Sequence, residues 1–419
     1  MPKTSTLYCN STVNGIAFGT TTYANMVGYR ANNATEAATQ LKVYDTLTGR
    51  NLYVRVPTNS VNAATTIRTR VNGVDGNLSV SVPASTTGTF EDTTNTDSLV
   101  SGNNYNYQIV TGGGAGTIFP NTKSVQLEHA DTLTTYLACA GSRATAAGST
   151  RNFVVVGRNI DVAAVASSQY RIRFSATWSR IRIYVSANAT TAASTFRSFK
   201  NGVNGAQSVS IGAGLTGEFE DTTNSDTLVA TDLINYRLAV GAGGALTHTL
   251  MQSRITTTST DTMVGFAGDG NNVNWNSTGF MAYGGGMESF ATETSVQALV
   301  RTTPQTVRNL FVYVVANARL NASTIESRKN SAPGNLSVSI PTLATGIFED
   351  TTNSDSLALT DTSNFRVILG AGVEDLEPSI VAVSLDVGVG GFIIPGFMTE
   401  GPAPRVRSQG NIVQSPQNA

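Results

Sequence analysis

The sequence predicts an all-β protein of three tandem β-sandwich domains that are jelly-roll-like and related by a 129-residue internal repeat. The segment FEDTTNTD begins at Phe90, and FEDTTNSD recurs at Phe219 and again at Phe348, at equal intervals along the chain. This period exceeds the ~20–50 residues of a solenoid unit and fits a complete domain with its own core. Frequent Gly (40 residues) and short apolar runs between turn residues favour strands over helices.

The same interval aligns positions far from this segment. Three sets of residues keep the spacing: Asn59, Asn188 and Asn317; Asn72, Asn201 and Asn330; Gly112, Gly241 and Gly370. From Arg50 to about Gly113 the three copies align without a gap. Because loops usually tolerate insertions, constant loop lengths indicate either recent duplication or loops that are constrained by contacts.

The third copy shows the strand pattern most clearly. Residues 335–341 alternate strictly, which places Leu336, Val338 and Ile340 on one face of a strand. The runs expected as strands are 295–300, 308–318, 323–330, 335–341, 346–351, 355–359, 364–372 and 379–387. About eight strands per copy fit a jelly roll of two antiparallel sheets. An immunoglobulin-like sandwich is the runner-up, but it is usually nearer ~100 residues long and carries a Cys–Trp–Cys pattern, which this chain lacks.

Turn-rich stretches suggest the domain boundaries. We expect a first sandwich with an N-terminal arm at 1–140, a second at 141–269, a third at 270–395, and an extended C-terminal tail at 396–419. The Gly- and Ala-rich stretches 139–152 and 267–279 are the expected linkers. The helix candidate of the first copy is the short run ATEAATQ at 34–40.

Composition argues against two classes of partner. The formal net charge is -1 and only 13% of residues are charged, so a basic surface for nucleic acid is not expected. There is no apolar run near ~18 residues, and the N-terminus lacks the apolar region of a secretory signal. We therefore expect neither a membrane segment nor a signal peptide.

An acidic motif within the repeat is the most tempting site. It places three carboxylates in each copy, which are Glu91, Asp92 and Asp97; Glu220, Asp221 and Asp226; Glu349, Asp350 and Asp355. Carboxylate oxygens are ligands for Ca²⁺, but the spacing lacks the glycine and terminal glutamate of an EF-hand loop. Asp, Asn, Ser and Thr also cap turns by accepting backbone N–H bonds. The sequence favours structural turns, with a calcium site as the alternative.

Catalytic groups do not recur between the copies. His129 and His248 are not at equivalent positions, because Thr258 stands one repeat interval after His129. No Ser–His–Asp set repeats either, so we expect no catalytic residues, no cofactor and no enzymatic activity. Neither Cys9 nor Cys139 is expected to have an equivalent in the other copies. Two free buried thiols are expected, and a disulfide between them stays open.

Aromatic residues leave a carbohydrate-binding adhesin as an alternative. Trp178 and Trp275 are the only tryptophans, and they are not equivalent. The repeat interval aligns Tyr53 with Arg182 and Phe311. No aromatic platform is therefore kept on that strand in all three copies, and packing within a sheet is the simpler interpretation.

At NGVDGNLSVSVP, TGTFEDTTNTDSL and NYNYQIVTGGG, with their repeats NGVNGAQSVSI, TGEFEDTTNSDTL and NYRLAVGAGG, the sequence resembles β-sandwich modules of tailed-bacteriophage virion proteins. The resemblance covers the centre of each copy, roughly half the chain. It implies a virion component on the exterior of the head, neck or tail, assembled in the host cytoplasm. It carries over no functional residues.

The resemblance and the repeat together suggest a role. We expect a non-enzymatic structural protein, a capsid decoration or head or tail exterior protein that binds neighbouring virion subunits and copies of itself as a homo-oligomer. Side-by-side domains would let one chain mimic a trimer, whereas end-to-end domains would form a fibre. We expect the N-terminal arm or the C-terminal tail to make the anchoring contact. A self-assembling extracellular surface or filament subunit is the alternative.

Overall fold

A computed structural model describes most of the chain. The described residues are 3–10, 15–29, 32–120, 122–129, 133–158, 161–257, 261–267, 278–281, 293, 297–299, 304–372, 375–386 and 397–398. Within them the chain consists of β-strands, turns and short 3-10 helices, which include η1 (Glu36–Thr39) and η2 (Ala166–Ser168). The all-β class is confirmed, and the expected helix at 34–40 is the single 3-10 turn η1. No helix among these residues has the length and apolar character needed to cross a membrane.

Domain 1 is a two-sheet sandwich of eight main strands. They are β1 (Lys3–Asn10), β3 (Thr21–Ala24), β6 (Leu47–Val56), β8 (Thr65–Val71), β9 (Val74–Val82), β10 (Gly88–Leu99), β11 (Asn104–Val110) and β13 (Thr122–His129). The short strands are β2 (Ile16–Ala17), β4 (Gly28–Tyr29), β5 (Leu41–Lys42), β7 (Thr58–Asn59) and β12 (Thr117–Phe119). The two main sheets have the orders β10-β6-β13-β1-β4 and β3-β11-β8-β9.

This strand order is that of a jelly roll. Counting the eight main strands along the chain, the first lies beside the eighth, the second beside the seventh, the third beside the sixth and the fourth beside the fifth. Such an order arises when one long antiparallel hairpin is rolled up into two facing sheets. The expected jelly-roll architecture is confirmed over the immunoglobulin-like alternative.

Domains 2 and 3 repeat the same order. Domain 2 contains β14 (Leu133–Thr145), β15 (Thr150–Phe153), β16 (Gly157–Arg158), β17 (Asp161–Val162), β18 (Tyr170–Arg171), β19 (Ala176–Thr190), β20 (Ser194–Lys200), β21 (Val203–Ile211), β22 (Gly217–Glu220), β23 (Ser225–Leu228), β24 (Leu233–Ala239) and β25 (Gly243–Thr257). Domain 3 contains β26 (Asp261–Ala267), β27 (Gly279–Met281), β28 (Gln297–Leu299), β29 (Gln305–Asn317), β30 (Ser323–Lys329), β31 (Ala332–Ile340), β32 (Gly346–Leu357), β33 (Thr362–Ile368), β34 (Leu376–Asp386) and β35 (Phe397–Met398). The sheets that contain their first strands run β14-β25-β19-β22 and β26-β34-β29-β32, matching β1-β13-β6-β10.

The strand pairing places the domain boundaries earlier in the chain than the sequence predicts. The expected N-terminal arm is strand β1, which pairs with β13 along its whole length. The second domain begins at Leu133 and the third at Asp261, rather than at 141 and 270, because β14 and β26 pair inside those sandwiches. The expected linker at 139–152 is therefore wrong, since it begins within β14. Most of the linker at 267–279 and of the tail at 396–419 lies outside the described residues.

The aligned asparagines and glycines hold loops in place, which explains the constant loop length. Asn59 Nδ2 donates to the carbonyls of Pro83 (3.1 Å) and Thr86 (3.0 Å), and Asn188 and Asn317 bind equivalent carbonyls in their own domains. A Cβ on Gly112 would lie 2.5 Å from the carbonyl oxygen of Ala64. An inserted residue would break these contacts, so the loops are constrained.

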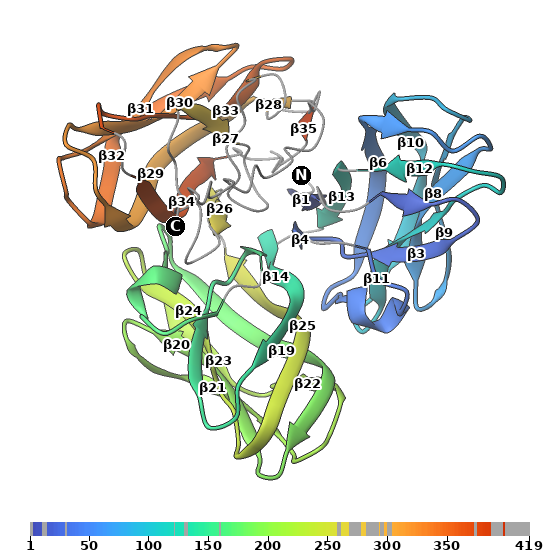
Figure 1. Cartoon of the computed structure of the whole chain (residues 1–419), viewed down its shortest axis with the longest axis horizontal. Helices are drawn as coiled ribbons and strands as arrows, with labels where there is room; N and C mark the ends of the chain where they lie inside the picture. Colours follow the sequence, from blue (N-terminus) through green and yellow to red (C-terminus); the bar gives the residue numbers. More distant parts are fainter. Residues whose placement is uncertain are drawn as a thin grey trace, which may run out of the picture.

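The three domains lie around a common centre (Figure 1). Their first strands, β1, β14 and β26, face this centre, whereas the turns between β9 and β10 and between β21 and β22 point outward. At the centre β14 contacts both β1 and β4, and β16 contacts both β4 and β26. Because β4 and β16 occupy equivalent places, one repeat interval apart, the arrangement approximates a threefold axis. The domains lie side by side and not end to end.

Candidate functional site

The second residue of each acidic motif, Asp92 in domain 1, organises a bulge in its strand. The pairing of β10 with β6 shifts register between Asp92 and Thr96. The Asp92 carboxylate accepts the backbone N–H groups of Ser79 (3.0 Å), Asn95 (3.1 Å) and Thr94 (3.2 Å). Burial alone would raise the pKa of this carboxyl, but these donors lower it to about 2. Asp221 and Asp350 bind the matching donors in their domains.

The last aspartate of each motif is a buried cross-strand acceptor. Asp97 accepts the Thr69 hydroxyl (2.6 Å) and the Asn77 N–H (2.6 Å). Asp226 and Asp355 bind the hydroxyls of serines and a backbone N–H in the same places. The structure therefore gives Asp92 and its equivalents the turn-stabilising role that the sequence favours, whereas Asp97 and its equivalents join neighbouring strands. In the described part of the chain, no group of three or more His, Cys, Asp or Glu side chains is arranged to hold a metal ion.

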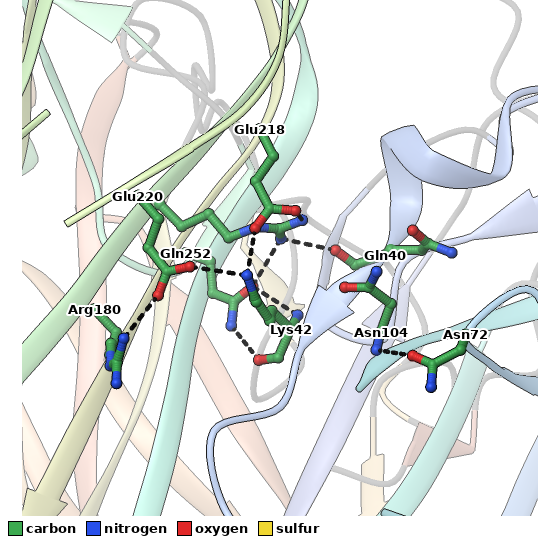
Figure 2. Close-up of polar contacts among 9 residues, drawn as sticks. Gln40, Lys42, Asn72, Asn104, Arg180, Glu218, Glu220 and Gln252 are labelled. Carbon is green, nitrogen blue, oxygen red and sulfur yellow. Dashed lines mark hydrogen bonds and ion pairs between the residues drawn. The ribbon is translucent and has the colours of Figure 1, made fainter. Parts of the chain in front are cut away.

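The glutamate of the motif has a different role in domains 2 and 3. Glu220 accepts a hydrogen bond from the Lys42 ammonium of domain 1, with 3.0 Å between Lys42 Nζ and Glu220 Oε2 (Figure 2). Glu218, two residues earlier on the same face of β22, accepts the same ammonium at 2.8 Å. The two carboxylates raise the pKa of Lys42 despite the opposing effect of partial burial. The repeated motif thus places an acidic side chain at the contact between domains.

Gln252 and Arg182 bind the backbone of the same segment of domain 1. The Gln252 amide accepts the N–H of Lys42 (3.0 Å) and donates to its carbonyl (2.7 Å), as an added strand would (Figure 2). Arg182 donates to the Gln40 carbonyl (2.9 Å), to Gln252 Oε1 (3.1 Å) and to Glu218 (2.8 Å). Gln252 and Arg182 are 0% and 1% exposed. Burial in a less polar environment strengthens each of these bonds and makes an unpaired partner costly.

Aromatic contacts extend this surface. The Tyr136 hydroxyl of domain 2 accepts the Tyr44 N–H (3.0 Å) and donates to Asp45 (3.1 Å), and the two tyrosine rings stack. The Arg180 guanidinium lies 5.3 Å from the centre of the Tyr44 ring. Arg180 has a left-handed φ of 60°, where the equivalent residues Asn51 and Asn309 have φ of 55° and 57°. A residue that resists this conformation therefore stands at the contact with domain 1.

Domain 2 contacts domain 3 through the equivalent segment. Arg171, in the place of Lys42, pairs with Glu349 (3.2 Å), and Arg173 pairs with the other oxygen of the same carboxylate. Phe311, in the place of Arg182, lies below Arg171, with 5.8 Å between the guanidinium and the ring centre. Each contact therefore joins a cationic segment of one domain to the repeated glutamate of the next.

Apolar packing continues across both contacts. The core of domain 1 includes Tyr136, Ala138 and Leu250 of domain 2. The core of domain 2 likewise includes Phe311, Ile380 and Ala382 of domain 3. Because apolar burial is the dominant favourable term in association, this packing stabilises both contacts. We call the β6–β10, β19–β22 and β29–β32 faces with their glutamates the acceptor faces.

The sequence offers only a weak signal for these contacts. Lys42, Arg182 and Gln252 have different residue types in the other copies, so self-comparison passes over them. The repeated glutamate is the feature of the sequence that could have indicated the contact. The aspartates are sufficient to shape the turn, yet a glutamate precedes them in every copy, at Glu91, Glu220 and Glu349.

The two histidines are buried apart. Burial lowers the pKa of His129 to about 4 and that of His248 to about 3, so both imidazoles are neutral at pH 7. His248 packs edge-on against Phe153, with 5.0 Å between the ring centres. Because both side chains are buried, neither presents its ring to a substrate in solution.

Cys9 and Cys139 occupy equivalent positions in their domains, contrary to the expectation from the sequence. Both are buried thiols outside any disulfide among the described residues, and burial raises the pKa of each thiol. Cys9 pairs across the sheet with Lys123 and lies beside Gly28, whereas Cys139 pairs with Met251 and lies beside Gly157. They are therefore equivalent, although their spacing exceeds the repeat interval by one position. This difference upstream of the glycines hides the equivalence from a comparison of the sequence with itself.

Trp178 does not offer a sugar-binding platform. Its side chain is fully buried, and its indole N–H donates to Ser253 (2.7 Å). Trp275 lies outside the described residues. A stacked sugar ring needs an exposed aromatic face, which Trp178 lacks.

Comparisons with known proteins add no family. No family model matches the chain, and no curated protein matches it. Among solved structures, the chain is weakly similar to PNGF-II, at 9% identity over 83% of this chain and 99% of that chain, with a TM-score of 0.21.

Proposed function

We propose that this chain is a non-enzymatic virion structural protein, a decoration protein of the capsid or of the head or tail exterior. The observation that carries the proposal is the arrangement of three jelly rolls around one centre, joined by equivalent contacts. A single chain of this shape presents three related surfaces in threefold relation, as a trimer does. The resemblance of the repeat to phage virion modules supports the same role.

The proposed partner is a local threefold position between capsid subunits. One chain would place one domain against each of three identical subunits there, so that three modest contacts combine into one strong attachment. The surfaces outside the acceptor faces remain for this purpose, because the acceptor faces of domains 2 and 3 are occupied within the chain. The proposal includes no catalytic residue, metal or cofactor.

The test is the mass of the purified full chain by light scattering, followed by sedimentation with capsids that lack decoration. The proposal expects a discrete particle that binds capsids to saturation, with one chain per threefold position. A matched variant, Arg182→Ala, disrupts the contact between domains 1 and 2 and is expected to bind capsids more weakly.

Two results would contradict the proposal. Growth of the pure protein into filaments would favour a self-assembling surface subunit instead. Unsaturable binding that Arg182→Ala does not change would indicate nonspecific adsorption.

A further inference from the structure

One cross-strand pair in the second sheet of each domain differs in charge between the three domains. The strand register places Arg68 opposite Gln108 in domain 1, Arg197 opposite Arg237 in domain 2, and Glu326 opposite Arg366 in domain 3. These positions are separated by the repeat interval, so the three pairs occupy the same place in the fold. The pairs can therefore be compared directly.

Domains 1 and 3 neutralise their cation at this place with a carboxylate from the same sheet. The Arg68 guanidinium pairs with Asp75 of the adjacent strand β9. The Arg366 guanidinium pairs with Glu326, with 2.6 Å between Nη2 and Oε1. A carboxylate side chain therefore fits this place in the fold.

Domain 2 has two cations at the same place. Arg197 replaces the glutamate of domain 3, and Asn204 replaces the aspartate of domain 1. Among the described residues, neither Arg197 nor Arg237 forms an ion pair with a carboxylate. Like charges directly opposite each other destabilise a sheet, so the two arginines do not favour the folding of domain 2.

Both guanidinium groups lie on the outer face of the sheet. Phe196 and Leu238, the neighbouring residues on the same strands, are in the core of domain 2, so by alternation the two arginines point away from this core. Both arginines are partly exposed, and Figure 1 shows β20 and β24 on the side of domain 2 that is away from domain 1. The Arg237 guanidinium lies over the Phe199 ring, 4.7 Å from its centre. Such stacking leaves the N–H groups at the edge of the guanidinium plane available to an acceptor.

We infer that the Arg197–Arg237 pair of domain 2 binds the carboxylates of an acidic segment of a partner protein. A guanidinium group donates two parallel N–H bonds to a carboxylate. The acid of the partner neutralises the repulsion between the two arginines, as Glu326 neutralises Arg366 within domain 3. The site occurs once per chain, and the inference does not depend on a virion location.

The surroundings of the pair favour a carboxylate over the phosphates of a nucleic acid. The neighbours of the pair in its own cross-strand row and in the two adjacent rows are uncharged, and they are Asn152, Ser208, Thr195, Ala239, Phe199 and Asn235. A nucleic-acid site has a longer stripe of cations. Two arginines match the charge of one or two acidic side chains.

Peptide binding to the full chain tests the inference. The probe is a fluorescent oligoglutamate peptide with blocked ends, and binding is measured by fluorescence anisotropy at fixed ionic strength. Arg197→Glu introduces the pair that domain 3 already has, and it should weaken binding about tenfold. The converse change, Glu326→Arg, places two arginines opposite each other in domain 3 and should add a second peptide site to the chain. Thermal unfolding of both variants checks that they are folded.

Two results would overturn the inference. Equal binding by the wild type and Arg197→Glu, including no binding by either, would show that the pair does not bind carboxylates. Displacement of the peptide by a single-stranded oligonucleotide at lower concentrations than by unlabelled oligoglutamate would indicate a phosphate ligand instead. Both results are independent of the capsid experiment, which tests the proposed function with a different variant and a different partner.

Discussion

At the scale of single residues, the aspartates and the glutamate of the acidic motif have different roles. Asp221 and Asp226 accept N–H and hydroxyl groups inside their own domain, whereas Glu220 binds Lys42 of the neighbouring domain. The same repeated motif therefore stabilises both the fold of its own domain and the contact with the neighbouring domain. A carboxylate with several backbone donors is difficult to replace, because each buried donor left without an acceptor costs about 1–3 kcal/mol.

Asp221→Ala tests this role. The change leaves the N–H groups of Ser208, Thr223 and Asn224 without their acceptor, and we expect the free energy of unfolding to fall by about 2–4 kcal/mol. The neighbouring Thr222→Ala alters an exposed side chain and should stay within about 0.5 kcal/mol of the wild type. Denaturant unfolding measures both. Equal effects would contradict the capping role.

The buried histidines predict acid sensitivity. Their folded pKa values, about 4 and about 3, lie below the unfolded value of ~6.5, so the unfolded chain binds more protons at mildly acidic pH. Stability is therefore full above pH ~6.5 and falls as the pH is lowered, by roughly 2 kcal/mol per histidine between pH 7 and pH 5.

His129→Thr checks the acid sensitivity. Thr257 occupies the equivalent place in domain 2, so the substituted side chain is one that the fold already accepts. The variant should lose about half of the change in unfolding free energy between pH 7 and pH 5. An unchanged pH profile would mean that His129 is not the titrating group.

At the scale of elements, the close contacts that the loops make explain why the three copies have the same length. Gly112 lies against the Ala64 carbonyl and the Ala63 side chain, whereas a Cβ on Gly113 would meet nothing within 4 Å. The same close approach recurs at Gly241 and Gly370. Gly112 therefore has no room for a side chain, whereas the adjacent Gly113 does.

The pair Gly112→Ala and Gly113→Ala tests this difference. Overpacking against the backbone should cost the first variant about 1–3 kcal/mol of unfolding free energy. The second should be neutral or stabilising by a few tenths of a kcal/mol, because alanine restricts the unfolded chain. Thermal unfolding of both variants under one condition decides. A tolerated Gly112→Ala would show that the loop can move aside.

At the scale of the whole molecule, the domains are not independent. The cores run through the contacts, with Leu250 packed in the core of domain 1 and Phe311 in that of domain 2. Apolar packing across a contact makes neighbouring domains unfold together, because separating them exposes apolar surface to water. We therefore expect calorimetry of the full chain to show domains 1 and 2 in one transition.

Arg182→Ala should separate that transition into two. The loss leaves the Gln40 carbonyl and Glu218 without a buried donor and should cost roughly 2 kcal/mol. Arg50→Ala is the control, because its pair with Glu128 is only half-buried and is expected to contribute less than about 1 kcal/mol. A single unaltered transition in the Arg182 variant would show that apolar packing alone couples the domains.

The sequence by itself determined the all-β class, the three copies and most strands, because alternation and turn residues act over short distances. It divided β32 into two runs, 346–351 and 355–359, since the bulge at Asp350 looks like a turn. It also favoured the turn role of Asp92, Asp221 and Asp350, each of which accepts N–H bonds from the residues two and three positions later.

Only the tertiary structure decided which strands begin each domain and how the domains meet. β14 and β26 pair with strands at the far end of their own domains, and Lys42 meets Glu218 and Glu220 of the next domain. Such distant pairs depend on the rolled topology and on residue types that differ between copies, so no local pattern reveals them. The equivalent cysteines show the same limit: one added residue removes them from the sequence repeat, while the sheet register keeps them in place.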